Sequence, residues 1–463
     1  MEVDGAPDEA AWRRERRVLV PIALCANFGF NLFAPFLPLY VRELGVDDPH
    51  EAAVWAGAAL GVSPLGAALT SAFWGMLADR TGTKIMLQRS LFASVVLYLG
   101  LGVVQAPIQL FLLRAAFGLF GGFGPLMMAR AAAVAPRAHV SQAVGLIQGL
   151  QLASLAVGPV LGGPLADLIG LRPTVFATAG LYCLAFVVAT FGLRETERAG
   201  RQESTATSRG GLWPPFVSER RWEWPTFVAT RPRVVASLRP RLSSSSFSLP
   251  RRLREGQAPW MGSLALVLLL TQVVDRGLAP ILPLYVAALD VPEGLLGTTT
   301  GLLIGASGFS AAGSAAFFGR LARRVSFVPL LGGGLLGAAG FCLGMLAAPT
   351  LVLFASARIG MALLIGSVAT LCYGAAARRA RLDRTASTIG LLATATFLGN
   401  AGGPVLGGAL GAGDLRRVFA IDTVLLLLAG LFAATVLRQL ARGPLPEAGL
   451  QSRGAAMTRQ EQA

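Results

Sequence analysis

Long apolar stretches alternate with short polar ones along most of the chain. A helix needs about 20 apolar residues to cross a membrane, and each of these stretches is long enough. The pattern predicts twelve membrane-spanning helices in two groups of six, separated by a polar segment at 194–260. We place the spans at 18–41, 53–77, 85–105, 108–132, 141–169 and 174–193, then at 261–288, 295–319, 327–347, 350–375, 385–411 and 417–438.

The second group of spans repeats the first. The hexapeptide Gly-Pro-Val-Leu-Gly-Gly at 158–163 returns at 403–408, a spacing of 245 residues. The stretch 34–41 returns at 279–286 with the same spacing, and Arg114 and Arg358 lie 244 residues apart. Landmarks that recur at one period indicate a duplicated structural unit. We therefore expect two pseudo-symmetric six-helix halves.

This division predicts five parts of the chain. The two halves occupy 18–193 and 261–440, and a basic linker at 194–260 joins them. Short tails at 1–17 and 441–463 complete the chain.

Composition excludes a soluble protein, and the charges indicate its orientation. Hydrophobic residues make up 54% of the chain and charged residues only 14%. The net charge is +15, but Lys84 is the only lysine, and 33 of the 40 basic residues fall in the tails, the linker and the loops on one side. This asymmetry is the positive-inside pattern of a plasma (inner) membrane protein, not a nucleic-acid surface. Both termini are therefore expected to be cytoplasmic.

The sequence also excludes several kinds of site. A P-loop ends in a lysine after a glycine-rich turn, and Lys84 stands in a different context. The four cysteines occur singly, and His50 and His139 fall in predicted loops. We expect no cofactor, no metal site and no enzymatic activity.

The loop between spans two and three carries a recognisable signature. It contains Gly75, Asp79, Arg80, Gly82 and Lys84 in the order G-x-x-x-D-R-x-G-x-K. The two glycines permit a tight turn at the membrane edge, and the aspartate can accept hydrogen bonds there. The stretch resembles the loop signature of the major facilitator superfamily. The resemblance implies that Asp79 latches the two halves together on the cytoplasmic side.

The equivalent loop of the second half departs from this signature. Arg323 stands where Asp79 would be, so only the first half offers a carboxylate.

The repeated hexapeptide belongs to a longer glycine frame in spans five and eleven. This frame is similar to the fifth-helix signature of the drug:proton antiporter branch of the family. Proline bends a helix, and a glycine stripe gives a smooth face on which a partner helix can rock. Simple close packing is the alternative. The residues concerned are Gly158, Pro159, Gly162, Gly163, Gly403, Pro404, Gly407 and Gly408.

Arg114 lies inside the fourth span, between Leu110 and Gly118. A charged residue within a membrane is costly and indicates function by default. The pattern resembles the family's fourth-helix motif, which implies a role in proton coupling. The alternative is an arginine that extends its charged end to the outer interface.

Asp275 and Arg276 are the most unusual pair in the seventh span. Asp275 is the only acidic residue expected near the middle of a span, since Asp167 and Asp422 are expected near the outer ends of theirs. Burial raises the pKa of a carboxyl group and a neighbouring arginine lowers it, so Asp275 is a candidate to bind and release a proton. The alternative is a structural ion pair with Arg114, Arg276 or Arg358.

A substrate cavity is expected between the two halves. The repeat aligns Gln272 and Arg276 with Asn27 and Asn31 of the first span, and aromatic side chains suit bulky apolar ligands. The candidate lining residues are Asn27, Asn31, Gln272, Arg276, Phe117, Tyr373 and Phe397.

These observations predict an all-α integral membrane protein with the major facilitator fold. The segments 34–40, 73–89 and 113–123 resemble the bacterial G-type multidrug efflux permeases. The resemblance implies a monomeric secondary transporter in the lipid bilayer that exports lipophilic small molecules or drugs in exchange for protons. The alternatives are a transporter of a specific metabolite, sugar or siderophore, a lipid flippase, and a membrane sensor that does not transport.

Overall fold

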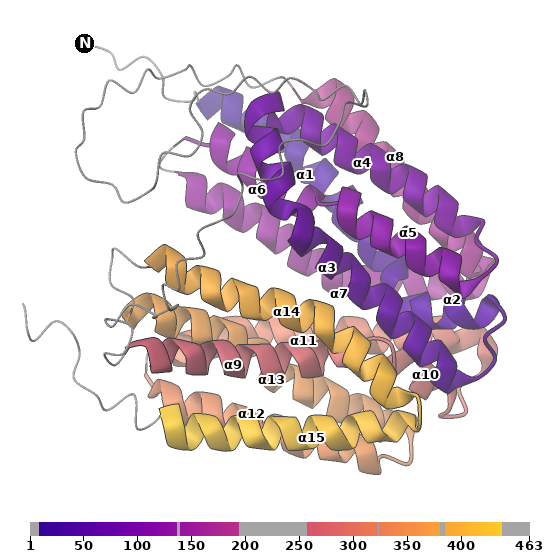
Figure 1. Ribbon diagram of the computed structural model, residues 1–463, viewed down its shortest axis with the longest axis vertical. Coiled ribbons are helices and arrows are strands. Elements are labelled where there is room, and N and C mark those ends of the chain that lie inside the picture. Colours follow the sequence, from indigo (N-terminus) through magenta and orange to yellow (C-terminus); the bar gives the residue numbers. More distant parts are fainter. Residues whose placement is uncertain (1–8, 137–138, 194–256, 323, 380–384, 438–463) are drawn as a thin grey trace, which may run out of the picture. The chain divides into compact units, whose positions relative to one another are not determined.

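The structure is a computed structural model of the 463-residue chain. It describes all residues except 1–8, 137–138, 194–256, 323, 380–384 and 438–463. Within the described residues every regular element is a helix, as Figure 1 shows. Eleven of these helices are long and apolar enough to cross a membrane. The predicted all-α membrane fold is confirmed.

The first half begins with a helix that is interrupted near its end. The helix α1 (Glu9–Phe33) starts well before the expected span and is followed by the turn η1 (Ala34–Phe36) and by α2 (Leu37–Glu43). The remaining elements are α3 (Pro49–Thr81), α4 (Thr83–Gly102), α5 (Pro107–Phe120), α6 (Phe123–Val134), α7 (Val140–Ile169) and α8 (Leu171–Gly192).

The second half repeats this order. Its first span is again interrupted, here between α9 (Gln257–Gly277) and α10 (Leu282–Ala287). The next helices are α11 (Leu296–Leu321), α12 (Phe327–Ala347), α13 (Leu351–Arg379), α14 (Thr385–Gly411) and α15 (Leu415–Phe432). The helix α9 is the one long helix of this half outside the eleven apolar spans, and it carries Asp275 and Arg276.

The interruptions follow from the sequence. Pro35 and Pro280 occupy the same place in the repeat, and proline lacks the N–H that would continue the helix. In span four the chain breaks between α5 and α6 at Gly121 and Gly122, where Gly122 adopts a φ of 39°. The corresponding α13 runs without a break, so the two halves differ here.

The break in span four leaves carbonyl oxygens that need other donors. The indole of Trp74 donates to the carbonyl of Leu119 at 2.7 Å. Arg89 donates to the carbonyl of Phe120 at 3.2 Å, and the hydroxyl of Ser90 donates to that of Gly121. Such replacement donors are what make a helix break tolerable inside a membrane.

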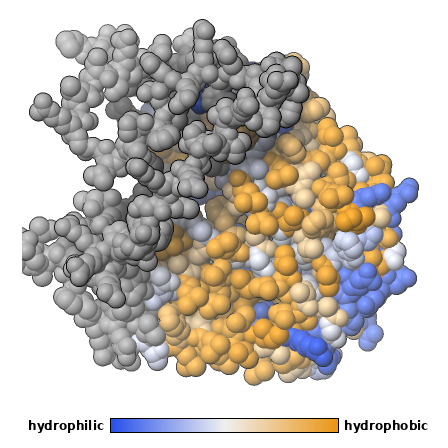
Figure 2. All heavy atoms as spheres, in the orientation of Figure 1, coloured by the Kyte–Doolittle hydropathy of each residue, from blue (hydrophilic) through white to orange (hydrophobic). Residues whose placement is uncertain are grey.

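Packing follows the repeat as well. The helix α1 packs on α7 as α9 packs on α14, and α4 packs on α8 as α12 packs on α15. The two halves meet along α7 with α11 and along α3 with α14. The outward faces carry exposed apolar side chains such as Phe191 and Val352, which are 85% and 78% exposed. Figure 2 shows hydrophobic residues over most of the described visible face, as expected for contact with lipid.

The linker and both ends of the chain fall largely outside the described residues. Only residues 257–260 of the predicted linker are described, and they begin α9. The predicted domain boundaries therefore stay predictions.

Candidate transport site

The repeated glycine motif brings helices into backbone contact within each half. A side chain at Gly158 would meet Cβ of Asn31 at 2.6 Å, so α7 lies directly against α1. In the second half a side chain at Gly403 would meet Cβ of Arg276 at 2.9 Å, so α14 lies against α9. Gly162 and Gly407 extend these contacts to the carbonyls of Leu32 and Gly277.

The last glycine of each motif faces the other half. A side chain at Gly163 would meet the carbonyl of Gly297 at the start of α11, and one at Gly408 would meet Gly57 of α3 at 3.1 Å. The carbonyls of Pro159 and Pro404 lie against Gly301 and Gly57. Close packing, one of the two interpretations of this motif, is therefore observed both within and between the halves. The structure does not test rocking along these faces.

Arg114 is enclosed in the first half. It is 1% exposed and donates to the hydroxyl of Tyr98 at 3.4 Å and to the carbonyl of Ala59 at 3.5 Å. The rings of Phe30 and Phe117 lie 5.5 and 5.8 Å from its guanidinium carbon. Arg114 thus does not extend to an interface. Among the described residues no carboxylate lies within salt-bridge distance of it.

Arg358 has a different environment at the matching position of the second half. Its Nη2 donates to Oδ1 of Asp275 at 3.0 Å, and the two side chains are 12% and 30% exposed. Of the three partners considered for Asp275, the structure thus selects Arg358. Arg114 does not take part.

Asp422 lies near this pair without a described hydrogen bond or ion pair to it, a proximity that the sequence did not indicate. It lies on α15, is 3% exposed and is close enough to Arg358 and Asp275 to interact electrostatically with both. It had been expected near the outer end of its span. Three buried atoms of this region lack a hydrogen-bond partner in the described part of the chain: Oδ2 of Asp422, Nη1 of Arg358 and Nε of Arg276. We call Asp275, Arg358 and Asp422 the acidic cluster.

The signature loop between α3 and α4 is only partly as expected. Gly82 joins the two helices with a φ of 96°, as a tight turn requires. Gly75 lies inside α3, not in the turn, because the helix continues to Thr81. Arg80 is exposed and Lys84 is partly buried, and neither forms a described bond to the other half. The side chain of Asp79 and all of Arg323 lie outside the described residues.

Two basic residues that the charge count grouped with the loops, at the ends of the predicted spans 85–105 and 108–132, lie inside helices. Arg89 is on α4, with its guanidinium 3.4 Å from the ring centroid of Trp74. Arg130 is on α6, 1% exposed, and bonds to Glu15 of α1 at 2.6 Å and to Thr83 of α4 at 3.2 Å. The alternation of apolar and polar residues gave no signal for Arg130, because its partner Glu15 lies 115 positions earlier.

Neither of the two described pockets is lined by the predicted cavity residues, and each of these residues has contacts of its own. The amides of Asn27 and Asn31 donate to carbonyls of their own helix at 2.8 Å. Gln272 packs against Gly399 of α14, and Phe117 is buried beside Tyr98.

The other two aromatic residues of the predicted cavity lining are Tyr373 and Phe397. The hydroxyl of Tyr373 lies 3.3 Å from that of Thr396, and Phe397 is 54% exposed. The predicted cavity lining therefore stays a prediction.

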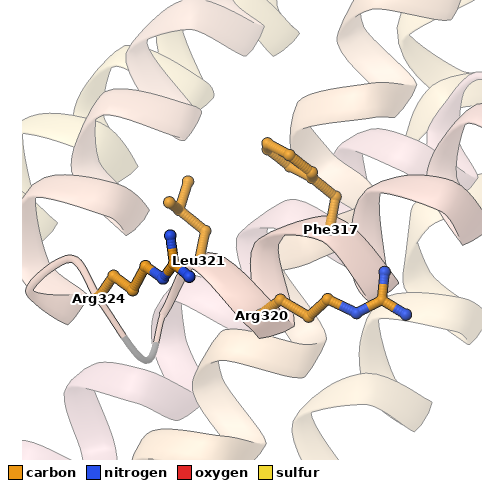
Figure 3. A pocket seen from close by; sticks show the side chains of 4 residues that line it. All are labelled: Phe317, Arg320, Leu321 and Arg324. Atoms are coloured by element: carbon orange, nitrogen blue, oxygen red, sulfur yellow. The ribbon is translucent and has the colours of Figure 1, made fainter.

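Two pockets are described, and neither lies at the acidic cluster. One of about 540 Å³ is lined by Phe317, Arg320, Leu321 and Arg324 at the end of α11 (Figure 3). Another of about 420 Å³ is lined by residues that include Arg42, His50 and Asp414. The first is the second-half counterpart of the signature loop, and its two arginines make it a poor match for a lipophilic ligand.

The eleven apolar spans, the helix α9 at the twelfth position, the repeated halves and the signature loop define a transporter fold. The family model described as Major Facilitator Superfamily matches residues 19–329 and 264–459. The chain belongs to the major facilitator superfamily and is a multi-pass membrane protein.

Proteins of similar sequence carry one name. The chain is 29% identical to "Multidrug resistance protein MdtG" of Rahnella sp. (strain Y9602), over 92% of this chain and 94% of that protein. It is 32% identical to the protein of the same name in Dickeya zeae (strain Ech586), over 70% and 69% of the two chains.

Solved structures share the fold at low sequence identity. A bacterial homolog of the human lysosomal transporter Spinster, in an inward-facing and occupied conformation, has a TM-score of 0.70 and 15% identity over 93% of this chain and 98% of that one. The peptide transporter POT in complex with alafosfalin has a TM-score of 0.67 and 14% identity, over 96% of each chain.

Proposed function

We propose that the protein exports lipophilic small molecules, including drugs, across the inner membrane in exchange for protons. The similarity to two proteins named multidrug resistance protein supports the substrate class. The single observation that carries the coupling is the acidic cluster, in which Asp275 binds Arg358 at 3.0 Å while the buried Asp422 lacks a partner for Oδ2.

The cluster can change partners when a proton binds. Protonation of Asp275 removes its charge and weakens its bond to Arg358, because a charged acceptor makes the stronger hydrogen bond. Arg358 has a second, unpartnered nitrogen, and Asp422 is the other carboxylate near it. A proton on Asp275 therefore favours contact between Arg358 and Asp422. This exchange would link proton binding in α9 to the packing of α13 and α15.

Arg114 has a supporting role in this proposal. A guanidinium does not release its proton in proteins, so Arg114 is no proton carrier by itself. It holds α3, α4 and α5 together through Ala59 and Tyr98. Asp79, on the signature loop, is proposed as the cytoplasmic latch on the strength of the family resemblance alone.

Orientation and oligomeric state complete the proposal. The excess of arginine in the tails, linker and one set of loops supports cytoplasmic termini. We propose a monomer, since the repeat already supplies two halves in one chain.

Drug susceptibility tests the substrate class. Cells that express the protein should tolerate higher concentrations of several dyes and antibiotics, and an uncoupler should abolish the gain. Unchanged susceptibility to the whole panel, with the protein present in the membrane, would contradict drug export.

Asp275→Asn tests the coupling. In proteoliposomes with an imposed pH gradient, the variant should lose gradient-driven drug transport while drug exchange without a gradient persists. Asp290→Asn is a matched control, because Asp290 is exposed and its φ of 56° suits asparagine. Gradient-driven transport by Asp275→Asn at the wild-type rate would remove Asp275 as the proton carrier.

A further inference from the structure

Asp167 connects the two halves at the end of the bundle where α7 ends and α11 begins. It lies near the end of α7, and its Oδ1 accepts from the backbone N–H of Gly297 at 2.8 Å. Its Oδ2 accepts from the N–H of Thr298 at 2.6 Å. Both donors belong to the first turn of α11, where backbone N–H groups lack partners within the helix. The positive end of the helix dipole also favours a carboxylate there.

The helices α7 and α11 approach so closely here that position 297 has no room for a side chain. A side chain at Gly297 would meet Oδ1 of Asp167 at 2.6 Å and the carbonyl of Gly163 at 2.7 Å. Any larger residue at 297 would therefore push the carboxylate away. Asp167 forms no other described hydrogen bond, so its polar contacts lie between the halves and not within one.

At the matching interface of the repeat no described carboxylate bonds across the halves, because the start of α3 is capped by its own Asp48. With a spacing of 245 residues, Asp167 corresponds to Ala412 at the end of α14. There Nδ1 of His50 lies 2.9 Å from the carbonyl of Gly411 instead. A residue needed only for packing would be expected in both copies of the repeat. Among the described residues, a carboxylate that bonds across the halves is found at the interface of α7 with α11 alone.

We propose that Asp167 is a gating residue of the transport cycle. Its carboxylate holds the start of α11 against α7 and keeps this end of the bundle closed. The contact must break each time the end opens. The inference rests on the proposed transport function, because alternating access requires that this end open and close. Asp167 acts on the position of α11 and touches no substrate.

Asp167→Asn is the direct test. Asparagine has the same shape but no charge and only one acceptor oxygen, so one of the two bonds is lost. Loss of one charge-assisted hydrogen bond corresponds to a shift of about tenfold in the ratio of open to closed protein. Asp167→Glu keeps the charge and should retain more of the closed population.

Distances between spin labels report this ratio. Labels at Leu161 of α7 and Leu302 of α11, both about half exposed, would be introduced after alanine replaces the four native cysteines. The full-length protein would be measured in lipid nanodiscs. Asp167→Asn should raise the ratio of the long-distance to the short-distance population about tenfold, as expected for one lost charge-assisted bond. The control Asp290→Asn, which removes a charge nearby, should leave it unchanged.

The outcomes separate the gate from the proposed function. A distance distribution of Asp167→Asn equal to the wild type would overturn the gating role. Equal shifts in Asp167→Asn and Asp290→Asn would do the same, since they would indicate a general charge effect. A shift confined to Asp167→Asn supports the gate even if no drug is transported. In that case drug export would fail on its own test.

Discussion

Arg114 and Arg358 occupy the same position in the two halves but have different partners. Arg114 is buried among aromatic rings and bonds to a phenol and a backbone carbonyl. Arg358 bonds to the carboxylate of Asp275, with Asp422 close by. A shared arginine with unshared acids shows which half can change charge. The first half has a cation with neutral partners, and in the proposed mechanism the second has one whose bond to Asp275 weakens when that carboxylate is protonated.

Arg358→Leu should lower the stability of the protein more than Arg114→Leu does. It leaves Asp275 and the buried Asp422 without their arginine. Breaking a fully buried ion pair costs about 3–5 kcal/mol, and because the Asp275 side chain is 30% exposed we expect a loss at the lower end of that range. Thermal unfolding in detergent, followed by tryptophan fluorescence, measures the loss. Arg114→Leu removes only neutral partners and should cost about 1–3 kcal/mol. Equal losses for the two variants would refute the contrast between the halves.

Removing Asp275 together with Arg358 should reverse part of that loss. Apolar residues in place of a buried ion pair are often neutral or stabilising, by up to about 4 kcal/mol. Asp275→Leu combined with Arg358→Leu should therefore be more stable than Arg358→Leu alone, by the same unfolding measurement. Gradient-driven transport should stay absent. A double variant no more stable than the single one would show that Asp275 does not depend on Arg358.

Local sequence predicts the fold and the close helix contacts, but it does not predict all partners of the buried charged residues. The spans, the repeat and the helix contacts at Gly158 and Gly403 follow from apolar runs and small residues within one segment. Asp422 could not be placed, because its role depends on how α15 packs against two helices from other parts of the chain. The same holds for Arg130, whose partner Glu15 comes from α1.

Tyr98→Phe should have a smaller effect, confined to the first half. It removes the hydroxyl that Arg114 contacts at 3.4 Å and leaves the surrounding ring contacts in place. The expected loss is about 0.5–1.5 kcal/mol, the typical contribution of one hydrogen bond. Unfolding temperature and proton-driven transport should be measured together. If transport fails while the unfolding temperature is unchanged, proton coupling depends on Arg114. That result would contradict the proposal that coupling belongs to the second half.

Gly75→Ala and Gly319→Ala should have the smallest effects on stability. Gly75 lies inside α3, where an added Cβ would meet no atom within 4 Å, and Gly319 lies inside α11 with only Thr370 at 3.5 Å. Alanine in a helix interior should stabilise each variant by about 0.5–1 kcal/mol. The two variants should differ in transport rate, because the family resemblance implies a latch only at the loop after α3. Gly75→Ala should slow transport in proteoliposomes and Gly319→Ala should not. Equal rates would show that transport does not require a glycine at position 75 of α3.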